Sequence, residues 1–187
     1  MIEAAKLGSV QAMKDAGDLA LEMGRSDESR FWFDSAANAG HPTAMWNLAV
    51  MNMQASDLAT AATWYQRAAE AGYVDGYAAL TQMARDRGDR TGERHWAQLG
   101  AEAGQTFCMV CHGTDLLMDA NGDVPTLWQA RDLLERAAER GEIDAASLSV
   151  NANFQLGDQA RARRYIQMVV DSGDQSEVDR MRRFGYL

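Results

Sequence analysis

A short segment in the middle of the chain, Cys108-Met-Val-Cys111-His112, carries residue types that bind metals and haem. Its spacing is that of the Cys-x-x-Cys-His string to which c-type haem is attached. In a helix, side chains at positions i, i+3 and i+4 share one face, so a zinc site or a thiol redox site is also conceivable. The segment predicts such chemistry only if the packing around it leaves these side chains free.

A second polar segment, Asp119-Ala-Asn-Gly-Asp123, has the acidic and glycine residues of a calcium-binding loop. An EF-hand needs glycine at its sixth position and an acidic residue at its twelfth. Those positions hold Val124 and Ala130, so we interpret the segment as a turn. The sequence also lacks Gly-x-Ser-x-Gly, His-Glu-x-x-His and phosphate-binding glycine patterns. We therefore expect no enzyme, no catalytic residues and no cofactor.

The composition is that of an ordinary globular protein. With 187 residues, 47% hydrophobic and 24% charged, the chain can form one domain with a substantial core. The net charge of −9 argues against nucleic acid as a partner. No stretch approaches the roughly 20 apolar residues that cross a bilayer. The N-terminal residues lack the apolar run of a signal peptide, and two cysteines are too few for a disulfide framework, so we expect a cytoplasmic protein.

An internal repeat organises the whole sequence. Short motifs of the type Ala-Ala-x-Ala-Gly recur, and the glycines that end them are 32 residues apart, except for one step of 37. Glycine readily adopts the left-handed conformation that ends a helix, so each of these marker glycines predicts a helix end. The marker glycines are Gly8, Gly40, Gly72, Gly104, Gly141 and Gly173.

Other positions keep a fixed distance from the marker glycine. A large side chain stands eight residues before it and usually a small one four before it, so one helix face combines bulk with close approach. A break follows the marker by sixteen residues, as at Ser56-Asp57 and Gly157-Asp158, where aspartate predicts a helix N-cap. The large residues are Trp32, Trp64, Trp96, Leu133 and Tyr165, and the small residues four after the marker are Ala12, Ala44, Gly76, Cys108 and Ala145.

Each unit therefore predicts two helices of about 14 residues joined by a tight turn. Such a pair cannot bury its apolar face alone and must stack on its neighbours. The predicted fold class is all-α, a right-handed α-α superhelix (solenoid) of about five helix-turn-helix repeats with terminal capping helices. We expect a single domain over 1–187, with repeats at approximately 8–39, 40–71, 72–103, 104–140 and 141–172 and a terminal helix over 173–187.

The arrangement Ala-Gly-x-x-x-Ala-x-x-x-Leu-Ala, followed by Trp-Tyr-Gln-Arg-Ala-Ala-Glu-Ala-Gly, resembles the Sel1-like repeat, a relative of the tetratricopeptide repeat (TPR). Residues 40–72 and 72–104 carry the pattern best. The extra residues within 118–125 are similar to the longer Gly-Val-Pro turn of many Sel1-like units. The resemblance implies a bacterial, cytoplasmic adaptor or scaffold in which the first helix of each repeat lines a concave groove for a peptide or a partner's surface.

By this resemblance, the groove positions lie three, six, ten and thirteen residues after each marker glycine. The side chains there are unusually apolar for a solvated lining, which favours a partner-binding surface in which Trp46 and Phe107 are free of the core. The acidic net charge suits a basic or amphipathic peptide. The predicted binding residues are Trp46, Val50, Met53, Gln82, Arg85, Phe107, Val110, Asn151 and Phe154.

Three alternatives remain open. In the repeat register Cys108 takes the position of Ala44 and His112 that of Leu48, which favours packing over a metal or redox sensor built on Cys108, Cys111 and His112. A β-lactamase-like hydrolase, an activity credited to cysteine-rich relatives, is a second alternative, although those relatives pair cysteines in every repeat. The third is self-assembly through the ends of the solenoid, including residues 181–187.

Overall fold

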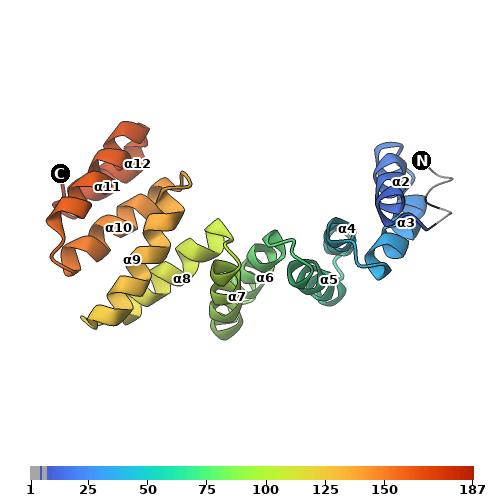
Figure 1. The fold of residues 1–187 in the computed structure, drawn as a ribbon, viewed down its shortest axis with the longest axis horizontal. Coiled ribbons are helices and arrows are strands. Elements are labelled where there is room, and N and C mark those ends of the chain that lie inside the picture. Colours follow the sequence, from blue (N-terminus) through green and yellow to red (C-terminus); the bar gives the residue numbers. More distant parts are fainter. Residues whose placement is uncertain (1–4, 6–7) are drawn as a thin grey trace. The chain divides into compact units, whose positions relative to one another are not determined.

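The computed structural model describes residue 5 and residues 8–187, and all its regular structure is helical (Figure 1). No β-strand occurs among these residues, which confirms the predicted all-α class. None of the described helices combines the length and apolar character that a membrane span requires. A capping helix before Gly8 would lie outside the described residues. The helices are α2 (Val10–Glu22), α3 (Ser26–Asn38), α4 (Pro42–Gln54), α5 (Leu58–Glu70), α6 (Asp75–Asp86), α7 (Arg90–Glu102), α8 (Thr106–Asp119), α9 (Val124–Ala138), α10 (Ile143–Gln155), α11 (Gln159–Ser172) and α12 (Gln175–Arg183).

These helices follow the predicted repeat. The pairs α2–α3, α4–α5, α6–α7, α8–α9 and α10–α11 each occupy one predicted unit. The paired helices range from 12 to 15 residues, close to the predicted length. The fourth unit holds the extra residues as a turn between α8 and α9, where Asn121 and Gly122 both have positive φ.

The marker glycines end the second helix of each pair, as predicted. Gly40 has a φ of 92°, and every other marker glycine also has a positive φ. The His41 amide donates to the Ala36 carbonyl at 3.0 Å, and the Gly40 amide donates to the Ala37 carbonyl at 3.0 Å. These bonds satisfy the last carbonyl groups of α3 and turn the chain directly into α4.

Aspartate caps begin the second helices α5, α9 and α11, whereas α3 follows Arg25, which forms no side-chain cap. The Asp57 side chain accepts a hydrogen bond from the Thr60 amide at 3.1 Å, and the Asp158 side chain accepts one from the Arg161 amide at 3.0 Å. A cap of this kind stabilises a helix by about 1 kcal/mol. The turns before α5 and α11 therefore each combine a residue with positive φ, Ser56 or Gly157, with an aspartate cap.

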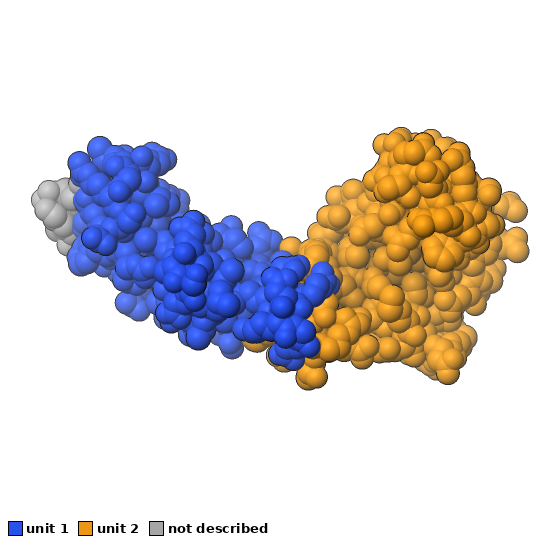
Figure 2. Space-filling model, turned by 180° about the vertical axis from the view of Figure 1, so that it is seen from behind, with its two compact units in different colours: residues 1–89 blue, residues 90–187 orange. Residues whose placement is uncertain are grey.

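The chain divides into two compact units, residues 1–89 and 90–187 (Figure 2). The first unit contains α2 to α6 and the second contains α7 to α12. The boundary falls between the two helices of the third repeat. That the repeats act as a single domain over 1–187 remains a prediction.

Small side chains allow close helix packing in the first unit. Ala36 and Ala44, on either side of the Gly40 turn, are fully buried. Phe33 is also fully buried, and its ring approaches α2 so closely that a Cβ on Gly17 would lie 2.5 Å from it. Burying a side chain of this size stabilises the fold by roughly 1.5–3 kcal/mol.

The second unit has a core of its own. Cys108 on α8 is fully buried, in the position that Ala44 holds on α4. Leu134 of α9 and Tyr165 of α11 are buried as well, so the second helices of two successive repeats both contribute buried side chains. The backbone carbonyl of Gly104, in the turn before α8, accepts a hydrogen bond from the Arg140 guanidinium.

A cluster of charged side chains joins α7 to α8 in this unit. Arg90 forms an ion pair with Glu93 at 3.0 Å and another with Asp115, and both carboxylates are largely buried. Arg94 continues the cluster to Asp119 at 2.8 Å. Because both arginines stay about half exposed, they keep part of their hydration while neutralising the buried acids.

Candidate binding surfaces

The nine residues predicted to bind a partner all lie on first helices of repeats, but the two units divide them. Five of them lie in the first unit and four in the second, and the extent of their burial differs. Trp46, Val50 and Met53 lie on α4 and Gln82 and Arg85 on α6, in the first unit, whereas Phe107 and Val110 lie on α8 and Asn151 and Phe154 on α10, in the second.

Trp46 is half-buried in a cluster of aromatic side chains. Its ring centroid lies 4.9 Å from that of Tyr65 on α5 and 5.0 Å from that of Tyr73 in the following turn. The side chain also packs against the core around Phe33. Such contacts contribute to stability beyond simple burial. Trp46 therefore supports the fold of the first unit, and only its uncovered part could meet a partner.

The other predicted residues of the first unit lie nearer the solvent. Val50 is half-buried and Met53 is 36% exposed. Gln82 is exposed, and its side-chain amide donates to Asp86 at 2.7 Å. Arg85 is exposed too. A role for these side chains in binding stays a prediction.

In the second unit a groove follows α10. This helix contacts α8 and α12, and a hollow of about 300 Å³ lies among the three helices. We call it the α10 groove. It is lined by Thr114, Leu117 and Met118 of α8, by Ser147, Leu148, Asn151 and Gln155 of α10, and by Arg180, Met181, Phe184 and Tyr186 from α12 and the residues that follow it.

Of the four predicted residues in the second unit, Asn151 lines the α10 groove. Phe154 lies one helical turn further along, where its ring stacks on Tyr186 with 4.9 Å between centroids. Phe107 and Val110 are half-buried and are not part of the lining. Of the four predicted residues in this unit, the α10 groove therefore includes one in its lining, and a binding role for all four stays a prediction.

Sequence reasoning missed the contribution of α12. The sequence predicts a terminal helix over 173–187 but assigns no binding residue to it, whereas four of the lining residues come from α12 and the segment that follows it. The signal was present in the repeat register, since Met181 stands eight residues after Gly173, as Leu48 stands after Gly40. Met181 and Leu48 are both essentially buried, so α12 takes the position of the first helix of a sixth repeat.

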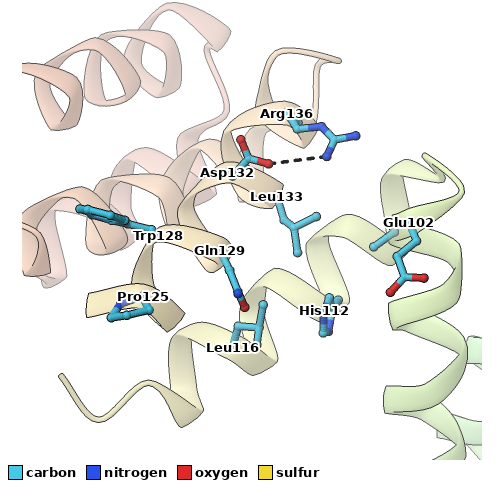
Figure 3. Close-up of a pocket in the computed structure, with 10 residues that line it drawn as sticks. Glu102, His112, Leu116, Pro125, Trp128, Gln129, Asp132, Leu133 and Arg136 are labelled. Carbon is cyan, nitrogen blue, oxygen red and sulfur yellow. Dashed lines mark ion pairs between the residues drawn. The ribbon is translucent and has the colours of Figure 1, made fainter. Parts of the chain in front are cut away.

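A second hollow, of about 580 Å³, lies among α7, α8 and α9 (Figure 3). It shares no lining residue with the α10 groove. We call it the Leu133 pocket. Its lining mixes apolar and charged groups, and one ion pair, between Asp132 and Arg136 at 3.6 Å, stands at its rim. The lining residues are Ala101, Glu102, His112, Leu116, Pro125, Trp128, Gln129, Asp132, Leu133 and Arg136.

His112 lies on the α8 side of the Leu133 pocket and is half-buried. Burial lowers the pKa of His112 below its ordinary 6.5, and the nearby carboxylates of Asp115 and Glu102 oppose this shift. The imidazole is therefore held mainly in its neutral form near neutral pH.

His112→Leu should make the stability less sensitive to acid. As the pH falls through 6.5, the unfolded chain takes up a proton at His112 before the folded protein does, so acid favours unfolding. Leucine removes this difference, and Leu48 shows that the repeat accepts it. Urea unfolding at about pH 7 and about pH 5 should show a smaller loss of unfolding free energy in the variant. Equal losses would mean that His112 is not the responsible group.

Cys108, Cys111 and His112 lie close in sequence but in different surroundings. Cys108 is fully buried, Cys111 is half-buried, and His112 borders the Leu133 pocket. Among the residues that the structure describes, no group of three or more His, Cys, Asp or Glu side chains is arranged to hold a metal ion. The structure gives no geometric support to a metal centre at this segment.

The architecture is that of a helical repeat protein, and comparisons with solved structures identify which kind. A Sel1 repeat protein from Oxalobacter formigenes matches with a TM-score of 0.70 and 20% identity, over 97% of this chain and 57% of that one. A protective antigen of uropathogenic Escherichia coli strains, displaying an SLR fold, gives 0.55 and 19%, over 93% and 48%. YrrB, a TPR protein with an unusual peptide-binding site, gives 0.56 and 14%, over 94% and 93%.

These matches confirm the resemblance found in the sequence: the chain has the helical repeat fold of Sel1-like and TPR proteins. It spans little more than half of the first of these structures and about half of the second. No family model matches the sequence, and no curated protein matches it.

Proposed function

We propose that this protein is a non-catalytic interaction module that binds a segment of a partner polypeptide in the α10 groove. The observation that carries the proposal is that apolar side chains from α8, from α10 and from the end of α12 line one groove, namely Leu117, Leu148 and Phe184. Phe184 is 64% exposed, so most of its ring is available to a partner. The groove volume lies at the lower end of the range for binding sites.

The lining also indicates what kind of segment would fit. Asn151 and Gln155 offer side-chain amides to a peptide backbone. Ser147 is 4% exposed, and its hydroxyl has no hydrogen-bond partner among the described atoms. Because Ser147 is among the lining residues, a bound peptide backbone is a candidate partner for this hydroxyl.

The charge of the groove refines the expected partner. Its lining contains one charged side chain, Arg180, and this already pairs with Glu177 at 3.2 Å. The lining contains no carboxylate that would attract a basic peptide. We therefore favour an amphipathic segment that inserts uncharged apolar side chains into the groove. The net charge of the chain alone suits a basic peptide equally well. A cytoplasmic location, which we expect from the sequence, remains a proposal.

Phe184→Ala should weaken binding of such a segment by at least about tenfold, because an exposed aromatic anchor contributes about 1.4 kcal/mol or more. The ligand is obtained by panning a random peptide display library on the full chain, and the affinity is measured by calorimetry. Phe31→Ala is the matched control, since Phe31 of α3 is 61% exposed and belongs to the first unit.

The comparison of the two variants decides the outcome. Selected peptides that lose affinity for Phe184→Ala but not for Phe31→Ala would support the α10 groove. Peptides that bind both variants as well as the unchanged protein would place binding elsewhere. A library that yields no specific binder would argue against a peptide-binding role.

A further inference from the structure

The first unit shows how the repeat normally fills the space between two successive second helices. Trp64 of α5, eight residues before Gly72, packs against the core cluster that contains Ala37 and Leu48. The guanidinium of Arg67 covers its ring, 4.2 Å from the centroid. In the first unit, an indole ring with an arginine over one face therefore packs at this position of the repeat.

In the second unit, the equivalent positions of the repeat line the Leu133 pocket. At the same offsets from Gly104 and Gly141, Ala101 replaces Ala37, His112 replaces Leu48 and Leu133 replaces Trp64. All three line the pocket of about 580 Å³ (Figure 3). Leucine is much smaller than the indole that fills this place in the first unit, so it leaves space beside it. The hollow therefore lies beside the repeat position at which the first unit carries the indole of Trp64.

Arg136 supports this interpretation independently. It stands five residues before Gly141, as Arg67 stands before Gly72, and it also lines the pocket. Arg67 has a ring to cover, whereas Arg136 turns to Asp132. That ion pair is exposed and costs little to rearrange.

We propose that the Leu133 pocket takes a tryptophan side chain carried by a partner polypeptide, with a basic residue beside it. The indole would fill the position that Trp64 fills from within in the first unit, under the guanidinium of Arg136. Pro125 and Trp128 extend the apolar wall beyond the opening, and Trp128 is 56% exposed. They give the flanking part of the partner a surface to pack on.

The charges at the rim indicate the neighbouring residue. Glu102 of α7 and Asp132 of α9 both border the opening. If Arg136 moves onto the bound ring, both carboxylates face the incoming chain without a fixed cation. A lysine or arginine next to the tryptophan would complement them.

A second copy of this chain is less suited to the pocket. Trp128 is the exposed tryptophan among the five in the sequence, the others being buried or half-buried. It belongs to the wall of the pocket itself. Occupation by a second copy would therefore require two chains to exchange Trp128 symmetrically, and such a dimer would be visible in solution.

The test uses the full chain and three short blocked peptides, Lys-Trp-Lys, Lys-Ala-Lys and Glu-Trp-Glu. Binding is followed by the indole N–H signal of Trp128 in nuclear magnetic resonance, assigned with Trp128→Phe. Lys-Trp-Lys should bind with millimolar affinity and the other two at least about tenfold more weakly. Leu133→Trp, which fills the pocket from within as in the other repeats, should abolish the shift without lowering the melting temperature.

Two controls keep the result interpretable. Leu133→Ile keeps the pocket and should keep binding, whereas Arg136→Gln removes the cation over the ring and should weaken binding several-fold. Unchanged binding to Leu133→Trp, or equal binding of Lys-Trp-Lys and Lys-Ala-Lys, would overturn the proposal. A concentration-dependent dimer that Leu133→Trp dissolves in sedimentation would also overturn it, in favour of a second copy.

Discussion

Replacing Gly76 by alanine should destabilise the first unit by about 2–3 kcal/mol, even though alanine is the better helix former. A Cβ at this position would overlap the backbone carbonyl oxygen of Tyr65 and lie 2.9 Å from the Cβ of Ala69. The carbonyl belongs to the regular backbone of α5 and cannot move aside as a side chain would. Helix α6 would have to shift away from α5, at the cost of the contacts between them.

The two effects of this substitution have opposite signs, which makes the measurement informative. Helix propensity alone would stabilise the variant by up to about 1 kcal/mol. Ala78→Gly, on the same helix at a half-buried position, tests the effect of helix propensity and should cost about 1 kcal/mol. Urea unfolding of both variants separates the terms. A Gly76→Ala protein as stable as the unchanged chain would show that α5 and α6 are not held this closely.

Glu135→Ala should lower the unfolding free energy by about 2 kcal/mol, because one carboxylate serves two helices. Its two oxygens accept hydrogen bonds from the Asn153 amide of α10 at 2.9 Å and from Arg161 of α11 at 3.0 Å. Asn153 is fully buried, so its amide would lose a partner in a place that water does not reach. The exposed half of Arg161 can return to water, and we assign most of the loss to Asn153.

Glu139→Ala provides the matched control. Glu139 follows α9 and pairs with Arg164 of α11 at 3.0 Å, but both side chains are about half exposed. Surface pairs of this kind contribute less than about 1 kcal/mol. Thermal unfolding of the two variants should therefore separate clearly. Equal effects would mean that the ion pairs, and not the buried amide, account for the stability.

Much of this fold could be predicted because local rules and the repeat agree. Gly40 has the left-handed φ that its position predicts, and Asp57 and Asp158 cap helices where the break in each unit places them. Cys108 occupies the buried small-residue position that its alignment with Ala44 indicates. Because the unit recurs six times in one chain, equivalent positions can be compared without any other sequence.

The binding surfaces were harder to predict, because they depend on how side chains fill space. Trp46 occupies a predicted groove position, yet Tyr65 and Tyr73 partly cover it. Neither tyrosine could be placed against it from spacing alone. The role of α12 was not predicted for a different reason, because the sequence over 173–187 predicts only a terminal capping helix. Its register with Gly173 was the usable signal.

Leu133 illustrates the limit most clearly. The sequence shows leucine where the other repeats carry tryptophan or tyrosine, but the substitution alone does not say whether neighbours close the gap. The answer depends on His112 and Ala101, which border a hollow instead of filling it. A change in one position of a repeat therefore becomes a site only through the packing around it.

Hydrogen exchange of the full chain, with and without a peptide selected from the display library, tests the central claim most directly. If the α10 groove is the partner-binding surface, amide protection on binding should concentrate in α8, α10 and α12. Protection centred on α4 and α6, where Trp46, Met53 and Arg85 lie, would contradict the account and assign binding to the first unit.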